Sequence, residues 1–479
     1  MAKIKIHFIV DITEQAAQFV PSFGVAYLSA FIKKHLPDVQ VSLSFLSDAV
    51  LADIARIKPD IVAFSSTSRY FEQLRAISDE VKVKFNLPIV WGGVHVSLAP
   101  DDLPVSADVG VIGEGEETLV QLLTNFKNGA FDRLESVQGI AYRINGTLIT
   151  TMRRPFIEPL DSIPPPDLGL FRVAWGPNHR AVIMTSRGCP YKCRFCASSL
   201  FWERARLYTP EYVVAEIKKL VNEYHVRELL IYDDFFSINR KRVARIAELM
   251  QTEPLLRKLR FECLSRVDNF NEDMAQQLKA MGVYRISFGI ESGCQKTLDY
   301  LKNKTISLGQ VEQAIGIAKK YGFECVGSFI IGSPYETAED IEEALSFIEK
   351  LHLDGIQITI ITPFPGTPLW EDGKAVGKIV DNKWSDKYYV LLGWEECFSL
   401  FAGGIRAKID EFLRNKVLMT QIDRDVFIKL VERAVRLQIK TNVRLRHILI
   451  LLIKKIMPQR GIQAILQVER SVLQRLRRR

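Results

Sequence analysis

Short apolar runs alternate with amphipathic helical patterns through about the first 385 residues of this 479-residue chain. Such alternation predicts βαβ units, in which a helix crosses over between two parallel strands. A single hydrophobic core stops growing at about 250–300 residues, so the length of the chain predicts at least two domains. The sequence therefore favours an α/β fold with two sheets. In sheets of this kind, ligands bind beyond the carboxyl ends of the strands.

Residues 1–140 are expected to form a Rossmann-like domain. Candidate strands occupy 5–10, 39–46, 60–66, 88–93 and the start of 109–126. Three of them end in small or acidic residues that would let a ligand approach the backbone closely. In any one loop such residues would fit a tight turn equally well, but their repetition at three strand ends favours a bound cofactor. The expected contacts are Ser65, Ser66 and Thr67, then Gly92, Gly93 and His95, and then Gly113, Glu114 and Gly115.

Residues 141–178 are predicted to form a hairpin and a linker between two domains. An Asn-Gly pair between two β-like runs indicates a hairpin within 131–151. Five prolines in the next segment, 153–168, exclude a helix or a central strand.

Residues 179–385 contain six further candidate strands with helical patterns between them. Parallel strands with long crossovers are typical of a (β/α) barrel, whose active site lies at the carboxyl ends of its strands. We therefore predict a partial (β/α)6 barrel of the TIM type. Residues 386–479 have helical patterns without strand signals, which predict a helical C-terminal extension.

Three of the seven cysteines lie within eight residues, after the first candidate strand of the barrel region. Cys189, Cys193 and Cys196 have the spacing C-x3-C-x2-C. A disulfide would need only two of these thiols, and a structural zinc site would normally take a fourth ligand from a second pair of cysteines. Three thiolates on one loop can instead hold three irons of a [4Fe-4S] cluster and leave the fourth iron open. The other four cysteines are scattered and are expected to be buried as small apolar side chains.

The cysteine loop resembles that of the radical SAM superfamily, in which an aromatic residue precedes the third cysteine, as Phe195 does here. The resemblance implies that the open iron binds S-adenosylmethionine (SAM), which one electron cleaves to methionine and a 5′-deoxyadenosyl radical. Other positions match the superfamily's motifs at strand ends, although each alone would also fit a helix cap, a turn or a surface ion pair. The implied SAM contacts are Phe195, Asp233, Asp234, Arg266, Glu291 and Gly332.

The first domain resembles the cobalamin-binding domain that precedes the barrel in a large branch of this superfamily. The matching stretches are PSFGVAYLSAFIKK, PDIVAFSSTS, WGGVHVSLAPDDL and GVIGEGEETLVQLL. Cobalamin domains that ligate cobalt through histidine carry D-x-H-x-x-G, whereas His95 lies in G-G-V-H-V. The resemblance therefore implies a cobalt without a histidine ligand. It leaves His95 to contact the nucleotide tail or cap a helix, and a side chain such as Arg69 or Tyr70 to meet the lower face of the corrin.

Together the resemblances imply a cobalamin-dependent radical SAM enzyme with a [4Fe-4S] cluster, SAM and cobalamin as cofactors. They favour methylation of an unactivated carbon in a small or lipid-like substrate, with an electron donor such as flavodoxin or ferredoxin. The arrangement is similar to that of hopanoid methylases and of the anaerobic magnesium-protoporphyrin ester cyclase. A cobalamin-assisted cyclase or rearrangement enzyme without methyl transfer is the alternative. A non-enzymatic cobalamin- or cluster-binding sensor is a more remote one.

The positive charge of the chain is concentrated at its C-terminal end. From residue 401 onward there are 19 Lys and Arg residues and 6 Asp and Glu residues, although the whole chain carries only +8. Basic and apolar residues alternate at helical spacing in 441–479, which fits either contact with an anionic membrane or a solvated helix packed on the barrel. Nucleic acid is disfavoured because the segment lacks aromatic side chains for stacking. The chain opens on a strand pattern rather than a cleavable leader, which predicts a cytoplasmic protein, with peripheral contact at the inner face of the membrane as an option.

Overall fold

Seven strands form one sheet in the N-terminal half of the molecule, in the order β2-β1-β3-β4-β5-β6-β7. The computed structural model describes residues 3–380, 383–388 and 405–442. Strands β1 to β5 pair in parallel, and β6 and β7 run antiparallel at one edge. The strands are β1 (Lys5–Val10), β2 (Gln40–Phe45), β3 (Ile61–Ser65), β4 (Ile89–Gly92), β5 (Val109–Val111), β6 (Ile140–Ile144) and β7 (Thr147–Thr150).

Helices cover both faces of this sheet, which explains why its central strands are continuous apolar runs. Parallel strands that are buried on both faces need apolar side chains at successive positions. On one face, α2 (Phe23–His35) and α6 (Glu116–Lys127) pack in the hydrophobic cluster that contains Phe8. On the other face, α3 (Val50–Ile57) and α4 (Phe71–Phe85) pack in the cluster that contains Phe64. The Rossmann-like fold expected from the sequence is confirmed.

The predicted hairpin forms and belongs to the first sheet. Asn145 and Gly146 turn the chain with φ angles of 50° and 80°, as a two-residue Asn-Gly turn requires. Strand β6 pairs with β5, with Ala141 opposite Gly110. The hairpin is thus the antiparallel edge of the N-terminal sheet, whereas the sequence pattern grouped it with the linker. The proline-rich residues that follow connect this edge to the second half.

Six parallel strands form the second sheet, in the order β15-β14-β13-β12-β11-β8. Strands β8 and β15 lie at its two edges, so the barrel is open, as predicted. The strands are β8 (Arg180–Ile183), β11 (Glu228–Ile231), β12 (Arg260–Ser265), β13 (Val283–Glu291), β14 (Glu324–Ile331) and β15 (Gly355–Ile360). The helices between them are α8 (Pro210–Tyr224), α9 (Arg240–Thr252), α10 (Glu272–Met281), α11 (Gln295–Lys302), α12 (Leu308–Lys320) and α13 (Ala338–Lys350).

Local sequence signals start several of these helices. The Thr209 side chain accepts a hydrogen bond from Tyr212 N, and Pro210 occupies the first turn of α8. Capping boxes join Ser307 to Gln310 at α12 and Thr337 to Asp340 at α13. Such caps satisfy backbone N–H groups that a helix leaves unpaired. They fix where each crossover begins after its strand.

The helical C-terminal extension is confirmed within the described residues. Helices α16 (Ile405–Leu413) and α17 (Arg424–Asn442) follow the barrel, and Gln438 of α17 accepts a hydrogen bond from Ile358 N in β15 at 2.7 Å. Most of the basic segment that was expected to meet a membrane, 443–479, lies outside the described residues. Within the described part of the chain, no helix is long and apolar enough to cross a bilayer.

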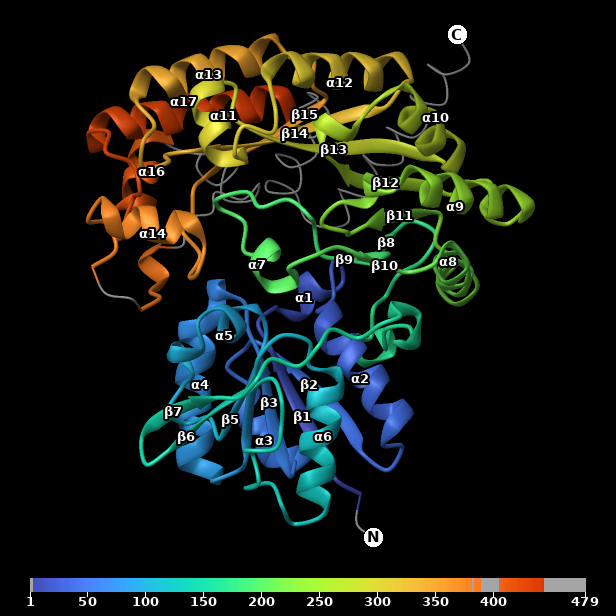
Figure 1. The fold of residues 1–479 in the computed structure, drawn as a ribbon, viewed down its shortest axis with the longest axis vertical. Helices are drawn as coiled ribbons and strands as arrows, with labels where there is room; N and C mark the ends of the chain where they lie inside the picture. Colours follow the sequence, from blue (N-terminus) through green and yellow to red (C-terminus); the bar gives the residue numbers. More distant parts are fainter. Residues whose placement is uncertain (1–2, 381–382, 389–404, 443–479) are drawn as a thin grey trace, which may run out of the picture.

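The two halves are stacked along the long axis of the molecule, with β9, α7 and β10 at their junction (Figure 1). Strand β9 (Ser186–Arg187), helix α7 (Ser198–Trp202) and strand β10 (Arg206–Leu207) belong to the segment that carries the three clustered cysteines. The carboxyl ends of β3, β4 and β5 face this segment, because their loops share a cavity with Phe201 and Trp202. The fold therefore brings the two predicted sites together.

Candidate active site

The clustered cysteines lie on residues 188–205, which leave the barrel at β9 and return at β10. We call these residues the cluster loop. Gly188 opens it with a φ of 87°. A Cβ on Gly188 would lie only 2.4 Å from the carbonyl oxygen of Arg204 and 2.6 Å from the Cβ of Trp202. Only glycine allows the two ends of the cluster loop to approach this closely.

The thiols of Cys189, Cys193 and Cys196 are free and partly buried. Among the described residues, no three His, Cys, Asp or Glu side chains converge on a position for one metal ion. The thiolates of a [4Fe-4S] cluster bind different irons and need not converge on a point. The Arg266 guanidinium lies 3.7 Å from Cys193 Sγ, and the Lys302 ammonium is buried close to the same thiol. Burial raises the pKa of Cys189, and it raises that of Cys196 to about 11, so these thiols would lose their protons on binding iron. Three cysteines on one loop are the soft ligand set that iron-sulfur clusters take, and this donor set therefore fits a cluster.

Arg194, between the second and third cysteines, ties the cluster loop to the far end of the barrel. Its guanidinium donates to both carboxylate oxygens of Asp372, at 2.9 and 2.7 Å, and the Tyr300 hydroxyl donates to the same carboxylate at 2.6 Å. Asp372 lies on α14 (Pro368–Ala375), which follows β15. Planar bidentate pairs of this kind fix orientation as well as distance. The cysteines are therefore held against the loops of later strands.

Asp233 and Asp234 follow β11 and lie in different surroundings. Asp233 is buried and accepts hydrogen bonds from Thr185 N at 2.6 Å and from the Thr185 hydroxyl at 2.5 Å, and its burial raises its pKa. It braces the chain after β8 against the chain after β11. Asp234 accepts from the Ser198 hydroxyl of the cluster loop at 2.6 Å. Of these two aspartates, both of which were expected to contact SAM, Asp234 is the one that contacts the cluster loop.

Arg266, the expected partner of the SAM carboxylate, is already paired within the protein. Its Nε and Nη2 atoms donate to Asp268 at 3.0 and 2.8 Å. The Tyr191 ring lies over the guanidinium, with 3.5 Å between the guanidinium carbon and the ring centroid. The remaining nitrogen, Nη1, is the one near Cys193. Arg266 therefore holds the cluster loop in place through its contacts with Tyr191 and Cys193.

Glu291, the expected ribose contact, ends β13 with a φ of 73°. Residues other than glycine rarely adopt this backbone conformation. Lys302 Nζ lies 2.8 Å from Glu291 Oε1, and both side chains are at most 10% exposed. Although burial opposes it, the Glu291 carboxylate raises the pKa of Lys302. Sequence reasoning missed Lys302, because a lysine within a helical pattern gives no motif.

Gly332 and Phe195 complete the expected SAM contacts. Gly332 follows β14 with a φ of 87°, and its N–H donates to Glu336 Oε2 at 2.6 Å. Burial raises the pKa of Glu336 to about 7. A Cβ on Gly332 would lie 2.9 Å from the ring of Phe427 in α17, so the C-terminal extension reaches this loop. Phe195 is partly buried, with Lys302 Nζ 5.9 Å from its ring centroid.

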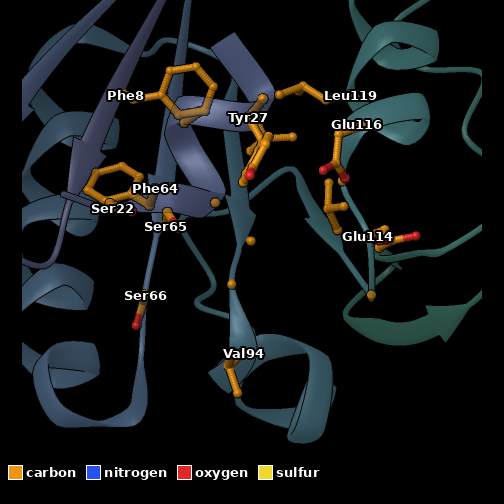
Figure 2. A pocket seen from close by; sticks show the side chains of 18 of the residues that line it. Phe8, Ser22, Tyr27, Phe64, Ser65, Ser66, Val94, Glu114, Glu116 and Leu119 are labelled. Carbon is orange, nitrogen blue, oxygen red and sulfur yellow. The ribbon is translucent and has the colours of Figure 1, made fainter. Parts of the chain in front are cut away.

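A cavity of about 300 Å³ lies at the carboxyl ends of the N-terminal strands. In Figure 2, Phe64, Ser65 and Ser66 lie on one side of it, and Glu114 and Glu116 on the opposite side. Eight of the nine expected cobalamin contacts line this cavity. They are Ser65, Ser66, Thr67, Gly92, Gly93, Gly113, Glu114 and Gly115.

Glycines give this cavity its open floor. A Cβ on Gly24 would meet no protein atom within 4 Å, and a Cβ on Gly92 would come no nearer than 3.9 Å. These positions form a cradle that side chains would fill. The Tyr27 hydroxyl also lies at the cavity, buried and without a hydrogen-bond partner within the protein. An extended group with polar atoms, such as the nucleotide tail of cobalamin, fits this lining.

Gly93 has a different, structural requirement. Its φ is 102°, and a Cβ there would lie 2.4 Å from the carbonyl oxygen of Ser66. The loop after β3 is further fixed by Asp11, which accepts from Thr67 N and from the Thr67 hydroxyl, both at 2.6 Å. Burial raises the pKa of Asp11. Neighbouring strand ends are thus locked together around the cavity.

His95 lies outside the cavity lining and inside the core. Its Nδ1 atom is 2.9 Å from the Ser68 hydroxyl, its Nε2 atom is 3.4 Å from Asp102, and its ring packs 3.9 Å from that of Phe71. His95 is 1% exposed. The His95 N–H donates to Ser66 O at 3.3 Å, so the residue lies next to the expected contacts while its ring packs outside the cavity lining.

The barrel half supplies part of the cavity wall. Met184, Arg187, Phe201 and Trp202 line it together with the N-terminal loops. Three of these residues lie on the cluster loop or immediately before it. The cavity and the clustered cysteines therefore both lie at the junction between the two halves.

Comparison with known proteins identifies both halves. The B12 binding domain family matches residues 9–123, and the Radical SAM superfamily matches residues 183–348. An uncharacterized methyltransferase of Pyrococcus horikoshii is 34% identical over 466 residues, which cover 91% of this chain and 98% of that protein. The anaerobic magnesium-protoporphyrin IX monomethyl ester cyclase of Cereibacter sphaeroides is 30% identical over 374 residues, which cover 74% of this chain and 60% of that protein.

A solved structure shares the arrangement of both halves. The radical S-adenosylmethionine methyltransferase TsrM of Kitasatospora setae, solved with cobalamin and a [4Fe-4S] cluster, superposes with a TM-score of 0.65. The superposition covers 78% of each chain at 18% identity, which supports a shared fold. The two matched domains and this shared fold agree, and the similarity to the methyltransferase at 34% identity extends over both domains. The chain belongs to the cobalamin-dependent radical SAM enzymes.

Proposed function

We propose that the protein transfers a methyl group to an unactivated carbon of a small or lipid-like substrate at the junction of its two halves. The observation that carries the proposal is the shared wall, in which cluster-loop residues Phe201 and Trp202 close the glycine-lined cavity. A cofactor in that cavity would lie next to the loop that holds the cysteines. Two matched family domains support the pairing of these cofactors in one enzyme.

The residues of this chain would divide the work of binding. Cys189, Cys193 and Cys196 would hold the cluster. Asp234 would accept from the SAM amino group, and Glu291 would accept from the ribose hydroxyls. With these groups bound, cleavage of SAM supplies the radical that removes a substrate hydrogen, and methylcobalamin supplies the methyl group that replaces it.

Aromatic side chains would keep water away from this chemistry. Tyr191 of the cluster loop packs against Phe235 with 5.8 Å between ring centroids, and Phe195 is partly buried within the same loop. Exclusion of water protects reactive intermediates from side reactions. The cluster loop would thus serve as both ligand and cover.

Product analysis of the reconstituted protein tests the proposal. The full chain would be loaded anaerobically with iron, sulfide and hydroxocobalamin, reduced chemically and incubated with SAM. Formation of both S-adenosylhomocysteine and 5′-deoxyadenosine is expected. Deoxyadenosine alone would favour the cyclase class, to which one relative at 30% identity belongs. No cleavage of SAM at all would contradict an enzymatic role and favour a sensor.

The partners and location follow from the same proposal. Reduction of the cluster would come from a protein such as flavodoxin or ferredoxin in the cytoplasm. The basic segment 441–479 would contact the inner face of the membrane, because basic side chains near an anionic surface each contribute about 1 kcal/mol of attraction. The full chain should then co-sediment with anionic liposomes, and a chain without residues 441–479 should not. Equal binding by both would refute membrane contact through this segment.

A further inference from the structure

The cluster loop has a narrow base that is formed by two arginines. Strands β9 and β10 pair antiparallel, with Arg187 opposite Arg206. Every residue of the cluster loop lies between these two positions. Contacts that hold Arg187 and Arg206 therefore fix both ends of the loop that carries the three cysteines.

Both arginines bind the same carboxylate of the N-terminal half. Glu114 Oε1 accepts from Arg187 Nη1 at 2.6 Å and from Arg206 Nη2 at 2.8 Å, and its Oε2 accepts from Arg206 Nη1 at 3.0 Å. Glu116 accepts from Arg187 Nη2 at 2.7 Å. These four side chains are at most 5% exposed. We call this buried group of two cations and two anions the Glu114 clamp.

Aromatic rings hold the two guanidinium groups in place. The Arg187 guanidinium carbon lies 4.9 Å from the ring centroid of Tyr27, and that of Arg206 lies 4.4 Å from the ring of Phe156. Trp202, at the end of α7, lies within 5.7 Å of both guanidinium groups. Arginine stacks on rings and pairs with carboxylates in a fixed plane. Trp202, a residue of the cluster loop, thus packs against the clamp that joins the two ends of the loop.

Glu114 also belongs to the cavity that is proposed to hold cobalamin. It lies between Gly113 and Gly115, and all three residues line the cavity. Its Oε2 accepts from Ile157 N at 2.8 Å, so the Glu114 carboxylate joins the glycine turn, the clamp and the chain after the hairpin. A group bound in the cavity would contact the turn at 113–115, which carries Glu114 of the clamp.

We propose that Arg206 is a positioning residue which, through the Glu114 clamp, couples occupancy of the cavity to the order of the cluster loop. The inference rests on the proposed function only in taking cobalamin as the group that fills the cavity. Arg206 lies outside the cavity lining and carries none of the expected cofactor contacts. Coupling between two sites is reciprocal, so an ordered cluster loop would also favour the filled cavity.

Hydrogen–deuterium exchange of the full-length, anaerobically reconstituted protein tests this coupling. Amide exchange in peptides from 188–205 reports local opening of the cluster loop, and hydroxocobalamin is the probe. In the unsubstituted protein, hydroxocobalamin should slow this exchange by about tenfold, within the usual range of coupling between sites. In Arg206→Gln, exchange should slow by less than about threefold at saturating hydroxocobalamin.

Two further variants keep the test decisive. Arg204→Gln is the matched control, because Arg204 lies on the same loop in an exposed ion pair with Glu158, and it should behave like the unsubstituted protein. If Arg206→Gln does not fold, Arg206→Lys keeps the charge but loses the planar fork, and it should show reduced protection. Full protection in a folded Arg206 variant with bound hydroxocobalamin would overturn the inference. Failure of the unsubstituted protein to bind hydroxocobalamin would instead refute the proposed function.

Discussion

Lys302 and Glu291 form a buried ion pair at the carboxyl end of the barrel, with 2.8 Å between Lys302 Nζ and Glu291 Oε1. The pair joins α11 to the end of β13 and lies close to Cys193. Each side chain supplies the hydrogen-bonding partner that burial of the other requires. The pair also fixes the orientation of the side chain that is proposed to accept from the ribose.

Lys302→Met is expected to lower the free energy of unfolding and to weaken nucleoside binding. Removal of one partner leaves a buried unpaired charge, which typically costs about 3–5 kcal/mol. The dissociation constant for S-adenosylhomocysteine should rise about tenfold, equivalent to about 1.4 kcal/mol. Urea unfolding and equilibrium binding measure the two effects. Lys304→Met, at an exposed neighbour, should change neither.

The double variant Glu291→Gln, Lys302→Met separates stability from binding. Neutralising both partners removes the unpaired charge, so most of the lost stability should return. Binding of S-adenosylhomocysteine should stay weak, because the acceptor carboxylate is gone. Recovery of binding together with stability would contradict a direct role for Glu291.

Adjacent glycines are expected to respond differently to the same substitution. Gly93→Ala places a Cβ 2.4 Å from Ser66 O at a φ of 102°, so it should lower the free energy of unfolding by about 2–3 kcal/mol. Gly92→Ala places a Cβ in open cavity space, so it should leave unfolding nearly unchanged and weaken hydroxocobalamin binding about tenfold. Thermal unfolding and cobalamin titration distinguish them. Equal loss of stability in both variants would argue against the claim that Gly92 borders open space in the cavity.

The cysteines should divide into cluster ligands and packing residues. Cys193→Ala is expected to lose most of its bound iron after reconstitution, because one of three thiolate ligands is missing. Cys294→Ala removes a buried cysteine outside the cluster loop and should keep the iron content of the unsubstituted protein. Iron and sulfide analysis measures the difference. Iron retained in Cys193→Ala would contradict the assigned ligand set.

Glu216 is expected to make the stability of the protein depend on pH. It lies on α8 and is 4% exposed, and its burial raises its pKa to about 8, with smaller effects from Lys219 and Asp233. The ordinary pKa in an unfolded chain is about 4.3. Its stabilising contribution is thus complete below the unfolded pKa and is lost as pH rises towards 8.

The corresponding experiment compares Glu216→Gln with the unsubstituted protein. Between about pH 5.5 and about pH 8, the unsubstituted protein should lose about 2–3 kcal/mol of unfolding free energy that Glu216→Gln keeps. Urea unfolding at several pH values measures this difference. Parallel pH profiles for the two proteins would show that Glu216 is ionised in the folded state.

Local sequence patterns predicted the elements of this fold well. The first strand was expected at 5–10 and occupies Lys5–Val10, since a short, continuously buried apolar run and its flanking turns are encoded within a few residues. The hairpin at Asn145 was also found, but its pairing with β5 was not. Pairing joins residues far apart in the chain, and no short-range pattern specifies it.

The site was predicted only as far as motifs extend. Cysteine spacing and small residues at strand ends pointed to two cofactors, but no motif indicates a role for Arg187. Its partner Glu114 lies 73 residues away in the chain and in the other half. Lys302 was missed because a lysine within a helical pattern gives no motif. His95 was expected at the cofactor because of its neighbours in sequence, whereas its side chain points into the core.

The fate of the SAM methyl group tests the central claim most directly. The reconstituted, reduced protein would be incubated with hydroxocobalamin and SAM that carries a trideuterated methyl group, and the products analysed by mass spectrometry. The account predicts the deuterated methyl group on the protein-bound cobalamin, together with S-adenosylhomocysteine. Recovery of the label only in methionine, beside 5′-deoxyadenosine, would contradict methyl transfer.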